Sequence, residues 1–537
     1  MFRKTAVFAL IMGLLFTSSA YAYNVQLKPF KDETYDYARE SIYALSALGI
    51  VAGYPDGTYR PDDALSREAF IKLLVSAAKI DTESGGRQLP SDVAGDRWSA
   101  PYVAAALERH WLGGLMDSTG KLHPGQTITR QEVATVIGTY LLASESQAAR
   151  DKWLSEDWLQ ERDARAFPDR ASMTAELQPY LYYAVHRGMM AGEPDGFKPL
   201  EPLTRKQAAA VIYRLIDRQI EAQSIDFTGF YAIQSYGAID QIDKLSNVIF
   251  GWSRLSYESE GSARLDTETS EYRIPRGYEE AIAAADEAQA GKELMVFYDG
   301  ADLKSFLKDM PARRAFIDSL METMEDKSYG FTGVCIDFEG LKDADSAVDL
   351  TAFLQELKKR LGTRTLSAAV PPSYYYGGYD LKEIGRIADT VILMAYDFTH
   401  HESKLPSAPL PLVNDTVQQA LVAVPKEKLV LGISKQANQW ITSTEGGAAA
   451  PPVSPAIADV EKRIGMPGVV QTRILPYFLD LITFQDDRGS HEIYYENSQS
   501  IADKIRLAKF YGLKGVSLWY MGNYTQADWA LIGQQAG

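Results

Sequence analysis

One pattern of turns and helices occurs three times in residues 28–218, and it restricts the fold of that region. In each copy a glycine-containing turn separates two amphipathic helices, and a Ser or Thr stands where the second helix begins. A Ser or Thr side chain accepts hydrogen bonds from the free N–H groups of a helix start. The pattern therefore predicts three helix–turn–helix units in one all-α module. The turns cover residues 53–61, 114–124 and 192–199, the helices before them 37–48, 101–112 and 177–190, and the caps are Ser66, Thr129 and Thr204.

The three copies resemble S-layer homology repeats, the modules that hold bacterial proteins on secondary polysaccharides of the cell wall. The entry motif F-x-D stands at Phe30 and Asp32 and again at Phe167 and Asp169. The resemblance implies repeats at residues 28–80, 89–145 and 165–218. An arginine follows each capping residue, and a guanidinium can hold a carboxylate through two hydrogen bonds. The resemblance thus implies that polysaccharide is bound by Arg67, Arg130 and Arg205.

An alternative remains open for these arginines, because each one would also pack well across the start of its own helix. The second copy differs from the others, since residues 115–120 replace the x-Pro-Asp-Gly turn. We therefore expect an altered binding surface at the second copy.

The remaining chain alternates short β-rich runs with helices, which predicts a (β/α)₈ barrel over residues 225–537. A short helical linker, residues 217–224, precedes it. A hairpin of residues 482–485 and 492–495 predicts a small insertion between strands seven and eight. The expected helices include 313–324, 347–361, 417–424 and 498–510. The expected strands are 228–233, 248–252, 294–298, 333–339, 365–370, 390–396, 429–434 and 515–519.

Residues 333–339 form an alternating strand that ends in two carboxylates. Side chains on a strand alternate between faces, so Cys335, Asp337 and Glu339 point the same way. In a barrel this face is the interior, and Glu339 lies nearest the C-terminal end, where such barrels keep their chemistry. Two acids about 6–7 Å apart along a strand raise each other's pKa, as a general acid requires. The alternative for an isolated D-x-E sequence is a solvated strand end.

This strand resembles the D-G-x-D-x-D-x-E signature of glycoside hydrolase family 18, the chitinase and spore-cortex N-acetylglucosaminidase family. Glu339 falls on the proton donor, and Asp337 falls on the acid that orients the substrate's acetamido group. Thr332 and Cys335 stand in place of the family's two outer aspartates. Further along the chain, the family's M-x-Y-D element and its last-strand tryptophan match Met394, Tyr396, Asp397 and Trp519.

The resemblance implies a catalytic role for Tyr396, whose hydroxyl would hold the acetamido carbonyl. It also implies that Asp397, Trp519 and Met394 bind substrate, with the indole forming the floor beneath the cleaved sugar. The expected reaction is cleavage of β-1,4 bonds next to N-acetylglucosamine by substrate-assisted retention, without a metal or organic cofactor. Two alternatives remain: a glycan-binding protein without activity and a structural surface-layer protein. The sequence does not separate chitin from peptidoglycan.

Composition excludes some partners, and the N-terminal segment predicts export. The 537 residues carry a net charge of −16, which argues against nucleic acid as a partner. Residues 1–22 read as a signal peptide, because Arg3 and Lys4 precede an apolar run and Ala20-Tyr21-Ala22 offers a cleavage site. We expect a secreted protein without a transmembrane anchor, held at the wall or S-layer of a Gram-positive-type envelope.

Two further expectations concern the barrel itself. Cys335 is the only cysteine, so no internal disulfide forms, and a lone thiol on a barrel strand predicts a small apolar filler. Aromatic residues near strand ends predict an extended sugar cleft. They are Trp252, Tyr374, Tyr375, Tyr376, Tyr379 and Trp440.

Overall fold

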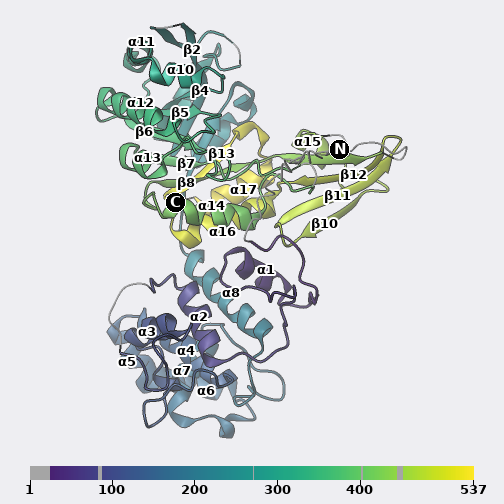
Figure 1. The fold of residues 1–537 in the computed structure, drawn as a ribbon. Helices are drawn as coiled ribbons and strands as arrows, with labels where there is room; N and C mark the ends of the chain where they lie inside the picture. Colours follow the sequence, from purple (N-terminus) through teal and green to yellow (C-terminus); the bar gives the residue numbers. More distant parts are fainter. Residues whose placement is uncertain are drawn as a thin grey trace, which may run out of the picture.

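The computed structural model describes residues 25–82, 88–259, 261–269, 271–400, 403–443 and 451–536. A helical module comes first, and a β/α barrel with a β-sheet arm follows it (Figure 1). This arrangement confirms the predicted fold class. The expected signal peptide, residues 1–22, lies outside the described residues. Within the described part of the chain, no helix has the length and apolar character needed to cross a membrane.

The helical module contains the predicted helix–turn–helix units. The second helix of each unit starts at the expected cap, since Ser66, Thr129 and Thr204 each accept a hydrogen bond from the backbone N–H three residues on. The helix before each turn is shorter than predicted, because the chain leaves helical geometry before the turn begins. The helices are α1 (Arg39–Ala47), α2 (Arg67–Ala77), α3 (Ala100–Glu108), α4 (Arg130–Ala143), α5 (Gln147–Lys152), α6 (Trp158–Arg165), α7 (Gln178–His186) and α8 (Arg205–Glu221).

Three backbone hydrogen bonds close the repeats into a ring. The N–H of Leu65 donates to Leu203 at 3.0 Å, that of Leu203 to Ile128 at 3.0 Å, and that of Ile128 to Leu65 at 2.9 Å. Each of these residues lies just before the cap of a second helix. The second copy, residues 89–145, therefore occupies a position in the ring equivalent to those of the first and third copies.

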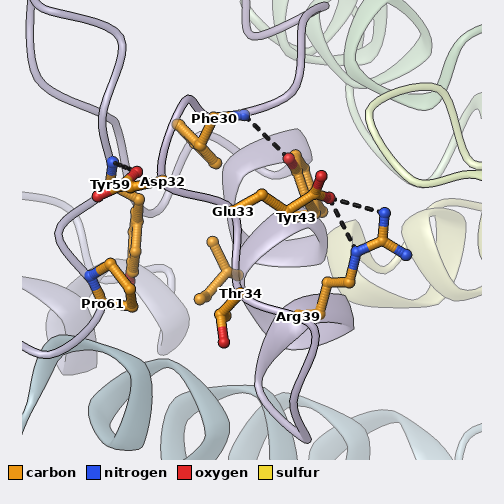
Figure 2. Close-up of a pocket in the computed structure, with 9 residues that line it drawn as sticks. Phe30, Asp32, Glu33, Thr34, Arg39, Tyr43, Tyr59 and Pro61 are labelled. Atoms are coloured by element: carbon orange, nitrogen blue, oxygen red, sulfur yellow. Dashed lines mark hydrogen bonds and ion pairs between the residues drawn. The ribbon is translucent and has the colours of Figure 1, made fainter.

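The aspartate of the entry motif holds the turn of its own repeat. Asp32 accepts hydrogen bonds from the N–H groups of Tyr59 and Arg60, both at 2.7 Å, as Figure 2 shows for Tyr59. Arg60 has a φ of 58°, a left-handed conformation that is unfavourable outside glycine, and the carboxylate offsets part of that cost. Asp92 and Asp169 bind their own turns in the same way.

Eight parallel strands form a closed barrel, because β1 pairs with both β2 and β13. All eight were predicted, and three have the predicted bounds. Two strands are shorter than predicted: β5 ends at Phe338, one residue before Glu339, and β7 ends at Leu393, since the chain turns before Tyr396. The strands are β1 (Asp226–Tyr231), β2 (Asn247–Ser259), β4 (Gly291–Tyr298), β5 (Gly333–Phe338), β6 (Thr365–Val370), β7 (Thr390–Leu393), β8 (Leu429–Ser434) and β13 (Gly515–Trp519).

Helices cover the outside of the barrel. The predicted helix at 417–424 is wrong in its bounds, because it begins at Leu410 and ends at Leu421. The α-helices of the barrel domain are α9 (Tyr278–Glu287), α10 (Leu303–Lys308), α11 (Met310–Glu325), α12 (Ser346–Leu361), α13 (Leu381–Ile387), α14 (Leu410–Leu421), α16 (Ser498–Tyr511) and α17 (Gln526–Gln535).

The insertion between β8 and β13 is larger than predicted. The expected hairpin is present as β11 (Leu479–Asp486) and β12 (Gly489–Tyr495). Two more strands, β9 (Ala437–Thr442) and β10 (Val470–Ile474), extend it to a four-stranded antiparallel sheet, accompanied by the short helix α15 (Ile457–Glu461). This sheet projects from the barrel as an arm (Figure 1).

The helical module packs directly on the barrel domain. Helix α8 ends at Glu221, and β1 starts at Asp226, so the connection is as short as predicted. The guanidinium of Arg506 on α16 donates to the hydroxyl of Tyr213 at 2.7 Å and forms an ion pair with Asp217, both on α8. Apolar residues of α1, α8 and α16 line the same junction.

Candidate active site

The two acids of β5 lie at the C-terminal mouth of the barrel. Asp337 is the last inward residue of the strand and is only 2% exposed, whereas Glu339 lies one residue beyond the strand and is partly exposed. The N–H of Glu339 donates to the carbonyl of Tyr298 at the end of β4, at 2.8 Å. Cys335 lies deeper, in the apolar cluster that fills the barrel interior. The strand thus positions the carboxyl of Asp337 below that of Glu339.

The environment of both acids favours their protonated forms. Burial raises the pKa of Asp337 well above its usual value, and the nearby Glu339 raises it further. Burial also raises the pKa of Glu339, with added repulsion from Asp397 and Asp299. Oδ1 of Asp337 is buried and has no hydrogen-bond partner among the described residues. A carboxyl that keeps its proton towards neutral pH has the property that general acid catalysis requires.

Tyr396 and Asp397 follow β7 and face the same acids. Burial raises the pKa of the Tyr396 phenol well above its usual value, and the charge of Asp337 adds to the shift. Asp397 has a left-handed backbone, with a φ of 62°. Its Oδ1 accepts hydrogen bonds from Gln436 at 2.8 Å and Ser407 at 3.3 Å, which fix the carboxylate in place.

The predicted site residues come together at one end of the barrel. Glu339, Met394, Tyr396 and Asp397 line a pocket of about 80 Å³. Trp519 lines a neighbouring pocket of about 170 Å³ and packs edge-on against Phe230, with ring centroids 5.2 Å apart. Asp337 contributes to the electrostatics of the first pocket from its buried position. No group of three or more His, Cys, Asp or Glu residues suited to a metal ion occurs in the described part of the chain.

Three residues of this site were not predicted from the sequence. Asp299 follows β4 and raises the pKa of Glu339, while Gln436 and Ser407 hold Asp397. The position of Asp299 directly after a barrel strand was a usable signal, because neighbouring strands end at the same mouth. Gln436 and Ser407 carried no comparable pattern.

The aromatic cleft residues were predicted with mixed success. Tyr375 and Tyr376 line the pocket with Glu339. Trp252 is fully buried against Phe250, with ring centroids 4.4 Å apart, so its prediction as a cleft residue was wrong. Trp440 was also misplaced: it is 2% exposed on β9, within the arm, where it packs against Tyr494.

Cys335 has an environment that keeps its thiol protonated. Burial raises the pKa of the thiol well above its usual value, and the carboxyls of Glu293 and Asp337 add to the shift. Glu293 itself is buried, accepts a hydrogen bond from Asn247 at 3.2 Å, and has a pKa raised to about 7 by burial. A neutral, inaccessible thiol is a poor nucleophile, so Cys335 acts as a filler of the barrel interior.

The three arginines of the helical module contact the turn of the next repeat. The alternative that each packs across the start of its own helix was wrong, because every guanidinium crosses to a neighbouring copy and donates to backbone carbonyls there. The distances are 2.7, 2.8 and 2.8 Å for Arg67 to Leu122, Arg130 to Phe197 and Arg205 to Tyr59.

Comparison with family models divides the chain as the fold does. The model for glycosyl hydrolases family 18 matches residues 225–523. The model for the S-layer homology domain matches residues 29–71 and 166–209. The middle helical copy lies outside these two matches.

Curated relatives match parts of this chain. The putative sporulation-specific glycosylase YdhD of Bacillus subtilis is 28% identical over 235 residues, which are 42% of this chain and 55% of the relative. The cortical fragment-lytic enzyme of the same species is 29% identical over 243 residues, 43% of this chain and 55% of the relative. The surface-layer 125 kDa protein of Lysinibacillus sphaericus is 22% identical over 68% of this chain and 26% of its own length. The chain thus spans about half the length of its first two relatives.

Solved structures share the barrel fold. The spore cortex-lytic enzyme SleL of Bacillus cereus matches with a TM-score of 0.50 and 22% identity, covering 59% of this chain and 75% of that one. The C-terminal domain of a putative chitinase from Desulfitobacterium hafniense matches with a TM-score of 0.50 and 20% identity, covering 59% of this chain and 100% of that one. At these identities the likeness concerns the fold.

Proposed function

Because this chain belongs to glycosyl hydrolase family 18, we propose that its barrel cleaves β-1,4 bonds next to N-acetylglucosamine in a glycan. The observation that carries the proposal is the position of Glu339. Its carboxyl lines a pocket at the barrel mouth, and its pKa is raised by burial and by Asp397 and Asp299. A protonated acid that lines an open pocket is what donation to a glycosidic oxygen needs.

The proposed reaction is substrate-assisted retention. Glu339 gives its proton to the glycosidic oxygen as the bond to the anomeric carbon breaks, and the substrate's N-acetyl oxygen forms a bond to that carbon. Asp337 and Tyr396 hold the acetamido group in line and stabilise the oxazolinium ion. Glu339, now a carboxylate, takes a proton from water. The water oxygen attacks the anomeric carbon as the bond to the N-acetyl oxygen breaks, which restores the acetamido group and gives overall retention.

Substrate binding is assigned to the remaining residues of the mouth. Asp397, held by Gln436, receives a hydrogen bond from the substrate, and Met394 packs against the N-acetyl group. Trp519 supplies an apolar floor for the sugar ring, because an indole face packs well against the apolar face of a pyranose. Chitin-type chains and peptidoglycan glycan strands both contain the required N-acetylglucosamine unit.

The helical module attaches the enzyme to the cell surface. The S-layer homology matches at residues 29–71 and 166–209 support a secondary wall polysaccharide as its partner, in a Gram-positive-type envelope. Arg67, Arg130 and Arg205 stand at the three contacts between repeats and are the candidate cations for an acidic polymer. The short connection between α8 and β1 holds the barrel close to the attachment site.

Digestion of chitooligosaccharides and purified peptidoglycan side by side, with product masses, tests the activity. We expect Glu339→Gln to keep the fold and reduce turnover at least about a hundredfold. Glu322→Gln, at an exposed position on α11, is the matched control. Cleavage by Glu339→Gln at the parent rate would remove Glu339 from the mechanism.

A glycan-binding protein without activity is the second candidate. Cys335 and Thr332 favour it, because they replace two acids of the family signature. A parent protein that retains N-acetylglucosamine chains but releases no product would establish this alternative.

A further inference from the structure

The three junctions of the helical ring are equivalent in backbone but differ in charge. Each junction is named here by the repeats that meet there: 1/2 contains Arg67, 2/3 contains Arg130, and 3/1 contains Arg205. In each, the guanidinium donates to carbonyls of the next repeat's turn. Two residues of that next repeat complete the junction, two and five positions beyond its own arginine, and these residues differ between repeats.

Junction 1/2 contains its own counter-ion. Arg67 forms an ion pair with Glu132, and the two side chains are 9% and 10% exposed. Glu132 also accepts a hydrogen bond from the N–H of Thr129, so it is held at the start of α4. A buried arginine that is already paired has little charge left for a ligand. The equivalent positions in the other repeats carry Gln207 and Ala69, which bring no charge.

Junction 3/1 brings two cations together instead of an ion pair. Lys72 donates to the carbonyl of Ile50, and Arg205 donates to that of Ala52 at 3.3 Å, so two cations face the same turn. Neither forms an ion pair with any carboxylate of the described residues. The positions equivalent to Lys72 are Thr135 and Ala210, so this junction alone brings a second cation.

The surrounding charges leave this pair of cations unmatched. Arg60 stacks on Tyr54 with its guanidinium 3.9 Å from the ring centroid, and it is already paired with Asp56. Lys206 on α8 is matched by two aspartates, Asp36 and Asp62. Two like charges held together in a partly buried place repel each other, and an anion placed between them relieves that repulsion.

We propose that junction 3/1 is the principal anion site of the module, that it takes a carboxylate carried by a sugar of the wall polysaccharide, and that junction 1/2 takes none. Arg205 supplies two donors in a plane, and Lys72 supplies a point charge beside them. Junction 2/3 ranks between the two, because Arg130 has no carboxylate partner among the described residues but also no second cation. This inference rests on the proposed attachment to wall polysaccharide.

The test uses the full chain and purified sacculi that retain their polysaccharide. Lys72→Thr installs the residue that the second repeat carries, and Lys121→Thr, at an exposed position of the second turn, is its control. We expect Lys72→Thr to weaken binding about tenfold or more, as loss of a charge-assisted hydrogen bond predicts, and Lys121→Thr to change it by less than about twofold. Equal binding by Lys72→Thr and the parent would overturn the assignment.

A second variant tests the neutralised junction in the opposite direction. Glu132→Gln removes the counter-ion of Arg67 and keeps the helix cap, because Gln207 performs the same capping in the third repeat. We expect this variant to bind sacculi more tightly than the parent. A loss of binding, with the fold intact, would show that Glu132 contacts the ligand and would contradict the proposal.

Chemical treatment of the sacculi identifies the anion. Reduction of polysaccharide carboxylates to alcohols should abolish binding of the parent, whereas removal of phosphate esters should leave it unchanged. Sensitivity to phosphate removal alone would overturn the carboxylate assignment. If the parent does not sediment with untreated sacculi, the proposed wall attachment itself is wrong. This outcome differs from a failure of the junction assignment, in which the parent binds but the variants or treatments give the opposite result.

Discussion

The phenol of Tyr379 donates a 2.6 Å hydrogen bond to the carbonyl oxygen of Phe338, the residue between Asp337 and Glu339. This bond joins the loop after β6 to the end of β5. A second close contact supports it, since a Cβ on Gly378 would lie 2.6 Å from the Cβ of Leu341. The loop after β6 therefore fixes the backbone of β5 that carries Asp337 and Glu339.

Tyr379→Phe removes this bond while keeping the ring in place. We expect turnover to fall about threefold to tenfold, because the Glu339 carboxyl loses part of its fixed orientation, and stability to fall by about 1 kcal/mol. Steady-state kinetics and chemical denaturation measure the two effects. An unchanged turnover with the expected stability loss would show that the bond has a structural role only.

Asp299→Asn should move the alkaline limb of the pH–activity profile to lower pH. The negative charge of Asp299 disfavours ionised Glu339, so its removal lowers the pKa of Glu339, and the acid loses its proton earlier as pH rises. The exposed Asp240→Asn is the control. A limb that stays in place would show that Asp299 does not contribute to the raised pKa of Glu339.

Cys335→Ala should leave the pH–activity profile nearly unchanged, because the thiol is neutral. Cys335→Asp adds a carboxyl between those of Glu293 and Asp337 and should shift the profile. The folded-state pKa of the new acid is raised by burial, so its destabilisation should be small at pH 5 and grow as pH rises to 8. Loss of activity in a folded Cys335→Ala variant would assign the thiol a role in catalysis.

Arg506→Ala should loosen the junction between the helical module and the barrel. The change removes the bonds to Tyr213 and Asp217, and since these side chains are partly exposed we expect a loss of about 1 kcal/mol. Protease cleavage at residues 222–225 should become faster. Arg314→Ala, at an exposed position on α11, should cleave as the parent does.

The barrel strands were predictable because parallel strands buried on both faces read as continuous apolar runs. Strands β6, β8 and β13 have the predicted bounds for this reason. Strand β2 was predicted too short, since its second half extends beyond the barrel and pairs with β3 (Ser262–Asp266) in a hairpin. Polar and apolar residues alternate in this hairpin, so the continuous apolar run that marks a barrel strand stops before it.

The candidate site was predictable where several functional residues occur together along the sequence. Asp337 with Glu339, and Tyr396 with Asp397, are short motifs, and the structure gathers both at the barrel mouth. Asp299 and Gln436 were missed because each is one polar residue after a strand, and its partner is distant in sequence. Trp252 was predicted on the wrong face of its strand. Side chains alternate between faces, so an error of one residue in the strand places a buried residue in the cleft.

The hydrogen-bonded ring of Leu65, Ile128 and Leu203 has a consequence for how the chain is made. Synthesis proceeds from the N-terminus, so the first repeat is complete long before the residue that closes the ring has left the ribosome. The hydrogen bond from the N–H of Leu65 forms only after Leu203 has been synthesised. The contact between Arg205 and the turn of the first repeat forms equally late. The helical module therefore completes its fold late although it precedes the barrel in the chain, and a chain truncated before residue 203 leaves the N–H of Leu65 without its partner.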